Sequence, residues 1–120
     1  MGNNYVPLEE LERFREYYNK QEGRNYPCSN QIVRCFIVTN DKDKATEYMK
    51  DKNVIKKIEA YDRIEWILEN GERWMWRYWN DNARGYRIYK MAIDKFIDKD
   101  LFYCVILPRC ATYCCSVEII

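Results

Sequence analysis

The dipeptide Asn70-Gly71 is the feature of this sequence that most restricts the fold, because it stands between two runs, 63–69 and 72–79, that are rich in strand-forming residues. An Asn-Gly step favours a type I′ hairpin turn, in which both central residues need positive φ. The segment 63–79 is therefore expected to be a β-hairpin, and a helix over 54–69 that ends at Gly71 is the alternative. The expected pairs nearest the turn are Leu68 with Arg73, Ile67 with Trp74, and Trp66 with Met75.

This register gives the hairpin two faces that both carry large aromatic side chains. One face is expected to be core and holds Ile64, Trp66, Leu68, Met75 and Trp79. The other holds Ile67, Trp74, Trp76 and Tyr78, beside Arg63 and Glu65. We expect the second face either to be partly exposed or to be covered by a helix.

The remaining elements follow from periodicity and turn residues. Helices are expected over 7–20 and 42–51, and strands over 32–39, 86–93, 101–107 and 111–120. Residues 54–61 fit either a helical face or a short strand. The sum is one compact domain over residues 1–120, of the α+β class. It would have a mostly antiparallel or mixed sheet of about five strands with two helices on it.

Cysteine use and the N-terminus bear on cofactors and location. The chain has six Cys and no His, and no C-x-x-C pair occurs. The cysteines are therefore expected to be small apolar residues, and neither a metal site nor a cofactor is expected. The first residues show no signal-peptide pattern, and no apolar run is long enough to cross a bilayer, which predicts a cytoplasmic protein without a membrane partner.

The residue types present also limit catalysis. Without His, neither the Ser–His nor the Cys–His nucleophile–base pair can be built. Both Gly-rich phosphate-binding fingerprints are missing as well. No catalytic residues are expected, and the protein is expected not to be an enzyme. The alternative is a metal-independent ribonuclease that stabilises phosphate with Arg, Lys and Tyr, for which the candidates are Arg73, Arg77, Arg84, Tyr86, Arg87, Tyr89 and Lys90.

An arginine–aromatic segment, residues 71–90, is the strongest candidate for recognition. It holds four Arg and one Lys against two acids, together with three of the four Trp in the chain. Arg forks bind carboxylate or phosphate, and Trp and Tyr rings stack or fill hot spots. The loop 80–87 has no evident core duty, and loops often carry function. The expected binding residues are Arg73, Trp74, Trp76, Arg77, Tyr78, Asn82, Arg84 and Arg87.

A short stretch resembles a known family. The run Ala83-Arg84-Gly85-Tyr86-Arg87, followed by Met91-Ala92-Ile93-Asp94, is similar to the stretch before the acidic, metal-binding strand of phage terminase ATPases. The phosphate-binding loop that such an ATPase requires is missing, so ATP hydrolysis does not carry over. Asp94 is expected to cap the end of its strand rather than to bind magnesium.

Taken together, these features favour a small binding protein of the inhibitor kind. The Lys/Asn/Ile/Tyr-rich composition suggests a phage or mobile element, and an anti-defence, anti-CRISPR-like role fits it. A net charge of +1 argues against bulk nucleic-acid binding. The expected target is a host protein or a nucleotide-type ligand. A nucleic-acid-binding accessory protein is a further alternative.

Overall fold

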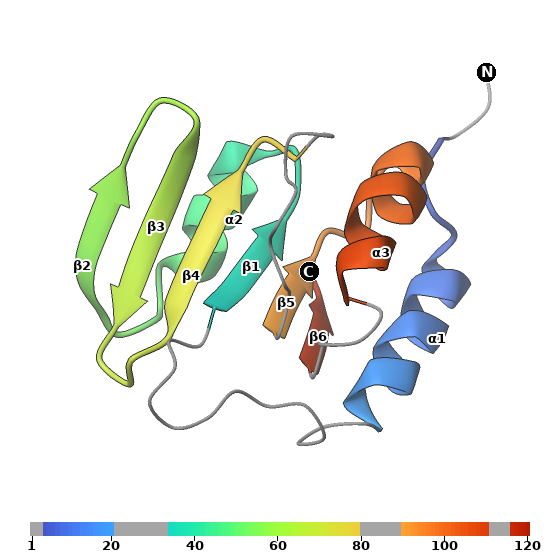
Figure 1. The fold of residues 1–120 in the computed structure, drawn as a ribbon, viewed down its shortest axis with the longest axis horizontal. Helices are drawn as coiled ribbons and strands as arrows, with labels where there is room; N and C mark the ends of the chain where they lie inside the picture. The colour runs from blue at the N-terminus through green and yellow to red at the C-terminus, as the bar shows by residue number, and fades with distance from the viewer. Residues whose placement is uncertain (1–3, 21–33, 80–89, 111–115) are drawn as a thin grey trace.

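The fold is built on a six-stranded sheet in the order β2-β3-β4-β1-β5-β6 (Figure 1). The computed structural model describes residues 4–20, 34–79, 90–110 and 116–120. Strand β3 runs antiparallel to both of its neighbours, and the other three strand pairs are parallel. The strands are β1 (Arg34–Val38), β2 (Val54–Glu59), β3 (Arg63–Leu68), β4 (Arg73–Arg77), β5 (Lys90–Ile93) and β6 (Ser116–Ile119).

Helices lie on both faces of this sheet. The described helices are α1 (Leu8–Asn19), α2 (Lys42–Met49), the π-helix η1 (Leu101–Ile106) and the short α3 (Leu107–Cys110). Their order and packing confirm the expected α+β class with a mixed sheet, and they confirm helices near 7–20 and 42–51. None of the helices in the described ranges is long and apolar enough to cross a membrane.

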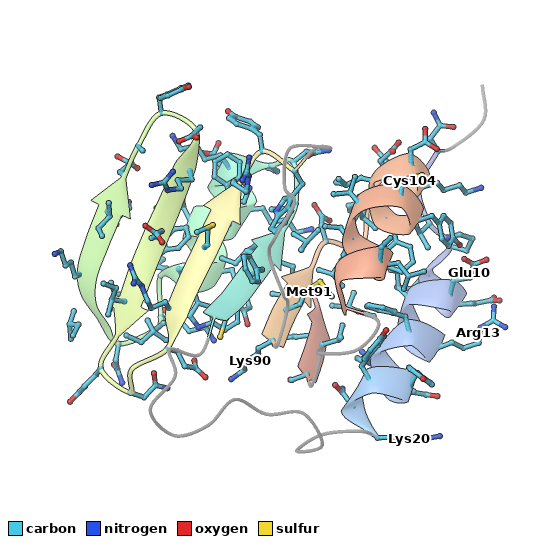
Figure 2. The ribbon with its side chains drawn as sticks, viewed as in Figure 1. Glu10, Arg13, Lys20, Lys90, Met91 and Cys104 are labelled. Atoms are coloured by element: carbon cyan, nitrogen blue, oxygen red, sulfur yellow. The ribbon has the colours of Figure 1, made fainter. Side chains whose placement is uncertain are left out.

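The apolar core is divided by the sheet into two layers. On one face, α1 and η1 pack on β1, β5 and β6, and Met91 points into this layer (Figure 2). On the other face, Ala45 and Met49 of α2 pack on β1, β3 and β4. The central strand β1 is buried on both sides, as its nearly continuous apolar character predicts.

The hairpin is confirmed, but the expected register is wrong by one residue. Trp66 pairs with Trp74 rather than with Met75, and Ile67 pairs with Arg73. The turn has three residues instead of two, since Leu68 N–H donates to Glu72 O (2.9 Å) and Gly71 N–H donates to Leu68 O (3.0 Å). Only Gly71 has positive φ (91°) among the described residues, which fits a type I turn closed by a glycine bulge.

This one-residue slip changes the faces of β4. Trp74 and Trp76 join Ile64, Trp66 and Leu68 under α2. Met75 and Trp79 lie in the opposite layer with Phe36. The expected grouping of Met75 and Trp79 with the first set is therefore wrong. Helix α2 covers the side of the hairpin on which both tryptophans of β4 lie.

The strand expected over 101–107 is wrong, because the chain forms η1 there. The buried side chains come in two pairs four residues apart, which is a helical spacing, and they are Leu101, Phe102, Val105 and Ile106. The side chain of Asp98 stabilises the start of η1, because its carboxylate accepts a hydrogen bond from Leu101 N–H (3.1 Å). The ambiguous segment 54–61 forms a strand, β2.

Candidate functional site

The half of the sheet made by β2, β3 and β4 has one face over which no described helix lies (Figure 1). Strand alternation and register place charged side chains among apolar ones on this face. We call it the basic strand face, and it consists of Lys56, Ile58, Arg63, Glu65, Ile67, Arg73, Met75 and Arg77. This face therefore carries four cations and one carboxylate, in a chain whose net charge is only +1.

Glu65 lies between two of these arginines. Its carboxylate is 3.7 Å from Arg73 Nη2 and 3.9 Å from Arg63 Nε. Such long, half-exposed ion pairs contribute little to stability, typically under about 1 kcal/mol. Arg73 Nε is buried and has no hydrogen-bond partner within the described ranges. Among the described residues, the ion pairs of Arg63 with Asp62 and Glu65 and of Arg73 with Glu65 are all 3.7 Å or longer, so the exposed nitrogen atoms of both guanidinium groups retain the capacity to bind a carboxylate from outside.

The predicted binding residues on β4 are distributed over both faces. Arg73 and Arg77 lie on the basic strand face and are half-buried. Tyr78 follows β4, is 52% exposed, and packs edge-on against Trp76 at a ring distance of 4.8 Å. Arg77 Nε donates to the carbonyl of Tyr78 (3.4 Å). The structure thus places Arg73 and Arg77 on the basic strand face, and Tyr78 lies just beyond the same strand, against Trp76.

Trp74 and Trp76 are buried, with 2% and 1% of their surface exposed. Trp74 Nε1–H donates to Glu72 Oε1 (3.1 Å), and Trp76 Nε1–H donates to the carbonyl of Thr39 (2.9 Å). Indole groups in this environment pack the core and satisfy their own polar atoms. The two indole rings therefore pack between β4 and α2 and are not part of the accessible surface.

Asn82, Arg84 and Arg87, the other predicted binding residues, lie outside the described residues, as do Tyr86 and Tyr89. Lys90, the remaining ribonuclease candidate, lies at the amino end of β5 (Figure 2). Its ammonium donates to Glu72 Oε2 at 2.9 Å. Burial alone would raise the pKa of Glu72, but the hydrogen bonds from Lys90, Trp74 and Asn70 outweigh it and lower that pKa. This pair links the starts of β4 and β5.

A second group of polar residues lies where β1 and β5 end. The two strands continue into helices on opposite faces, and the crevice outside such strand ends is a common ligand site in sheets of this kind. A hollow of about 450 Å³ lies there, with Lys44 and Asp94 in its wall. Sequence reasoning did not assign Lys44 or Thr39 to any site. Thr39 directly follows the apolar strand β1, and Lys44 lies in the first turn of α2, but only the parallel pairing of β1 with β5 brings them to Asp94.

Asp94 has both carboxylate oxygens engaged within this group. Oδ2 accepts from the Thr39 hydroxyl (2.6 Å), and Oδ1 accepts from Lys44 Nζ (2.7 Å) and from Phe96 N–H (2.9 Å). Burial would raise the pKa of Asp94, but these hydrogen bonds lower it. The bond to Phe96 caps the end of β5, as expected from the sequence. The bonds to Thr39 and Lys44 make Asp94 a tie between two strands and α2.

The thiols that the structure describes differ in burial. Cys35 is fully buried in β1, and burial raises the pKa of its thiol to about 12. It therefore packs as an apolar residue, as predicted. Cys104 on η1 is exposed (Figure 2). Across the described residues, no group of three His, Cys, Asp or Glu side chains is arranged to hold a metal ion.

Comparison with known proteins adds no assignment to this geometry. No protein-family model, no curated protein and no solved structure matches the chain.

Proposed function

We propose that the protein is a small non-enzymatic binding protein that inhibits a host protein through the basic strand face. The observation that supports this proposal is the face over which no described helix lies, on which the four cations Lys56, Arg63, Arg73 and Arg77 share the surface with one acid, Glu65. Apolar Ile58 and Ile67 lie between these charges. Arginine beside apolar surface is typical of protein–protein hot spots, and the excess of cations favours an acidic partner surface.

The state of the buried chemical groups supports binding rather than catalysis. Asp94 is the only carboxylate among the described buried residues, and Thr39 and Lys44 already occupy its oxygens. The Cys35 thiol is neutral at physiological pH, because its pKa lies near 12. Catalytic groups usually have pKa values that allow proton transfer or nucleophilic attack near neutral pH. The pKa of Cys35 is raised away from that range, and the pKa of Asp94 is lowered away from it.

The proposed biological setting is an anti-defence protein of a phage or mobile element, anti-CRISPR-like, that acts in the cytoplasm of a bacterial host. Support comes from the composition and from the short resemblance to phage terminases around Asp94. A nucleotide or nucleic-acid target is the second candidate, since guanidinium groups bind phosphates as well as carboxylates. The two candidates differ in salt dependence, because phosphate-backbone binding weakens steeply with added salt.

The test is affinity capture from a bacterial host lysate, with mass spectrometry, by the wild-type protein and two charge-matched variants. Arg63→Glu/Arg73→Glu reverses two charges on the basic strand face. Lys42→Glu/Lys50→Glu reverses two exposed charges, one at the start of α2 and one directly after its end, and serves as the control. We expect one host protein to be retained by the control and lost by the face variant. Titration of the purified partner should then show affinity reduced on the order of 100-fold.

A further substitution tests the charge argument in the opposite direction. Glu65→Gln removes the one acid of the face without changing its shape, so the partner should bind a few-fold more tightly. Equal binding by the wild type, the face variant and the control would refute the assignment of this face.

A further inference from the structure

The two outer strands of the sheet are protected to different degrees. At the β6 edge, the side-chain amide of Asn19 bridges the backbone of Val117, accepting from its N–H (2.9 Å) and donating to its carbonyl (3.3 Å). Helix α1 thereby covers the edge of β6. Strand β2 is the outermost element on the other side, and within the described residues nothing pairs with its outer edge (Figure 1).

The register of β2 against β3 identifies which backbone groups point outward. Ala60 N–H donates to Arg63 O (2.9 Å), so residues 60 and 63 form a hydrogen-bonded pair. Inward and outward positions alternate in an antiparallel pair. The pairs Lys57–Trp66 and Glu59–Ile64 are therefore not hydrogen-bonded pairs. In both, the N–H and C=O groups of the β2 residue, Lys57 or Glu59, point away from β3.

The side chains of β2 are unusually apolar for a solvent-exposed edge. Ile55 is 68% exposed and Ile58 is 36% exposed, and Tyr61, just beyond the strand, is 97% exposed. An open edge with apolar side chains is a template for another strand. Two features oppose indiscriminate pairing, namely the adjacent Lys56 and Lys57 and the irregularity between Val54 and Lys56.

The lysines also indicate what kind of strand fits. In antiparallel pairing of β2 with a second copy centred on the strand, Lys56 and Lys57 would lie against the same two lysines, and like charges directly opposite are destabilising. An acidic strand would instead place carboxylates near these ammonium groups. Those side chains of the added strand that lie on the same side of the sheet as the basic strand face would also extend the surface on which Arg63 lies. The edge therefore disfavours self-association and favours an acidic partner.

We propose that the partner adds an extended, acidic segment to the free edge of β2, antiparallel or parallel, and so lengthens the sheet by one strand. This inference rests on the proposed function, because it specifies how a protein partner would engage the same half of the sheet. Backbone hydrogen bonds to Lys57 and Glu59 would supply affinity, and alternate side chains would supply charge specificity.

A defined peptide probe tests this without the natural partner. We would titrate isotopically labelled protein with a short peptide of alternating valine and glutamate, capped at both ends. Binding should slow hydrogen exchange at the amides of Lys57 and Glu59. A peptide of alternating valine and lysine should bind at least about tenfold more weakly, because its lysines share one face of the added strand and place like charges against Lys56 or against Lys57.

Lys57→Pro is the informative variant, with Lys57→Ala as its matched control. Proline removes the outward N–H at position 57 without removing a bond to β3, and proline is tolerated on edge strands in this orientation. We expect Lys57→Pro to bind the acidic peptide about tenfold more weakly than Lys57→Ala does. The acidic peptide N-methylated on alternate residues lacks backbone donors and should not bind the wild-type protein. This second probe tests strand addition even if Lys57→Pro does not fold.

Each other outcome overturns the inference. No binding of the acidic peptide, or equal binding by Lys57→Pro and Lys57→Ala, would exclude strand addition. Sedimentation that shows a dimer of the wild type, dissociated by Lys57→Pro, would assign the edge to a second copy. Loss of partner capture on Arg63→Glu/Arg73→Glu together with an unaffected Lys57→Pro would retain the proposed function and reject only the edge.

Discussion

The two halves of the sheet use their side chains differently. Strands β1, β5 and β6 have helices against them, and Phe36, Ile37 and Ala92 are completely buried. Strands β2, β3 and β4 have α2 on one face, and their other face, over which no described helix lies, carries charge. Asn19 binds the outer edge of β6, whereas no described residue pairs with the outer edge of β2. We infer that the first half stabilises the fold and that the second half is available for recognition.

Trp76→Ala should give the largest effect on stability. The indole lies under α2 with 1% exposure, and it also donates to the carbonyl of Thr39. Truncation leaves a cavity and an unsatisfied carbonyl, and it should lower the free energy of unfolding by about 3–5 kcal/mol. Arg73→Ala on the opposite face of the same strand should cost no more than about 1 kcal/mol.

Urea denaturation of both variants checks this contrast. Similar losses for the two variants would mean that the faces of β4 do not differ as described. Because Trp76→Ala is expected to be strongly destabilised, a loss of binding in that variant would reflect unfolding. Trp76→Phe, which keeps an aromatic ring, is therefore the better variant for binding assays.

Asp94→Asn should give the next largest effect and a pH dependence. Losing charge-assisted hydrogen bonds to Thr39 and Lys44 should cost about 2–3 kcal/mol at neutral pH. Because the folded-state pKa of Asp94 is lowered, its contribution is present above the ordinary carboxyl value. It is lost as the pH falls through the folded-state pKa.

Denaturation curves recorded between pH 7 and pH 2 would measure this contribution. The wild type should lose more stability than Asp94→Asn as the pH falls below about 4. Parallel curves for the two proteins would contradict the tie between β1, β5 and α2.

Asn19→Ala should give the smallest of these effects, and it tests the protected edge. It removes both side-chain bonds to Val117 and should cost about 1–2 kcal/mol, with faster hydrogen exchange at the Val117 amide. Lys57→Ala on the open edge should change stability by less than about 0.5 kcal/mol. If both substitutions cost the same, the two edges are equally supported and the contrast between them fails.

Local patterns in the sequence predicted most elements, and pairing decided the rest. Helical spacing predicted α1 and α2, and Asn70-Gly71 predicted the β3–β4 hairpin. The register was missed because the same dipeptide also fits a three-residue turn, and that difference moves Trp74 and Trp76 under α2. The expected strand over 101–107 was wrong because its apolar residues also fit a helix, and such short runs are ambiguous.

The candidate site was predictable only in part. The cationic character of Arg73 and Arg77 could be seen in the sequence, and both lie on the basic strand face. Lys56 and Ile58 could not be assigned to it, since the 54–61 segment was ambiguous and the β2–β3 pairing is not encoded locally. The same limitation applies to Thr39, Lys44 and Asp94, which meet only through the parallel pairing of β1 with β5.

Hydrogen–deuterium exchange of the complex with the captured host protein tests the central claim most directly. We predict that partner binding slows exchange within residues 54–77, most strongly in β2, and leaves α1, α2 and β6 unchanged. Protection centred on the helices, or on the hollow beside Asp94, with β2 unchanged would contradict it.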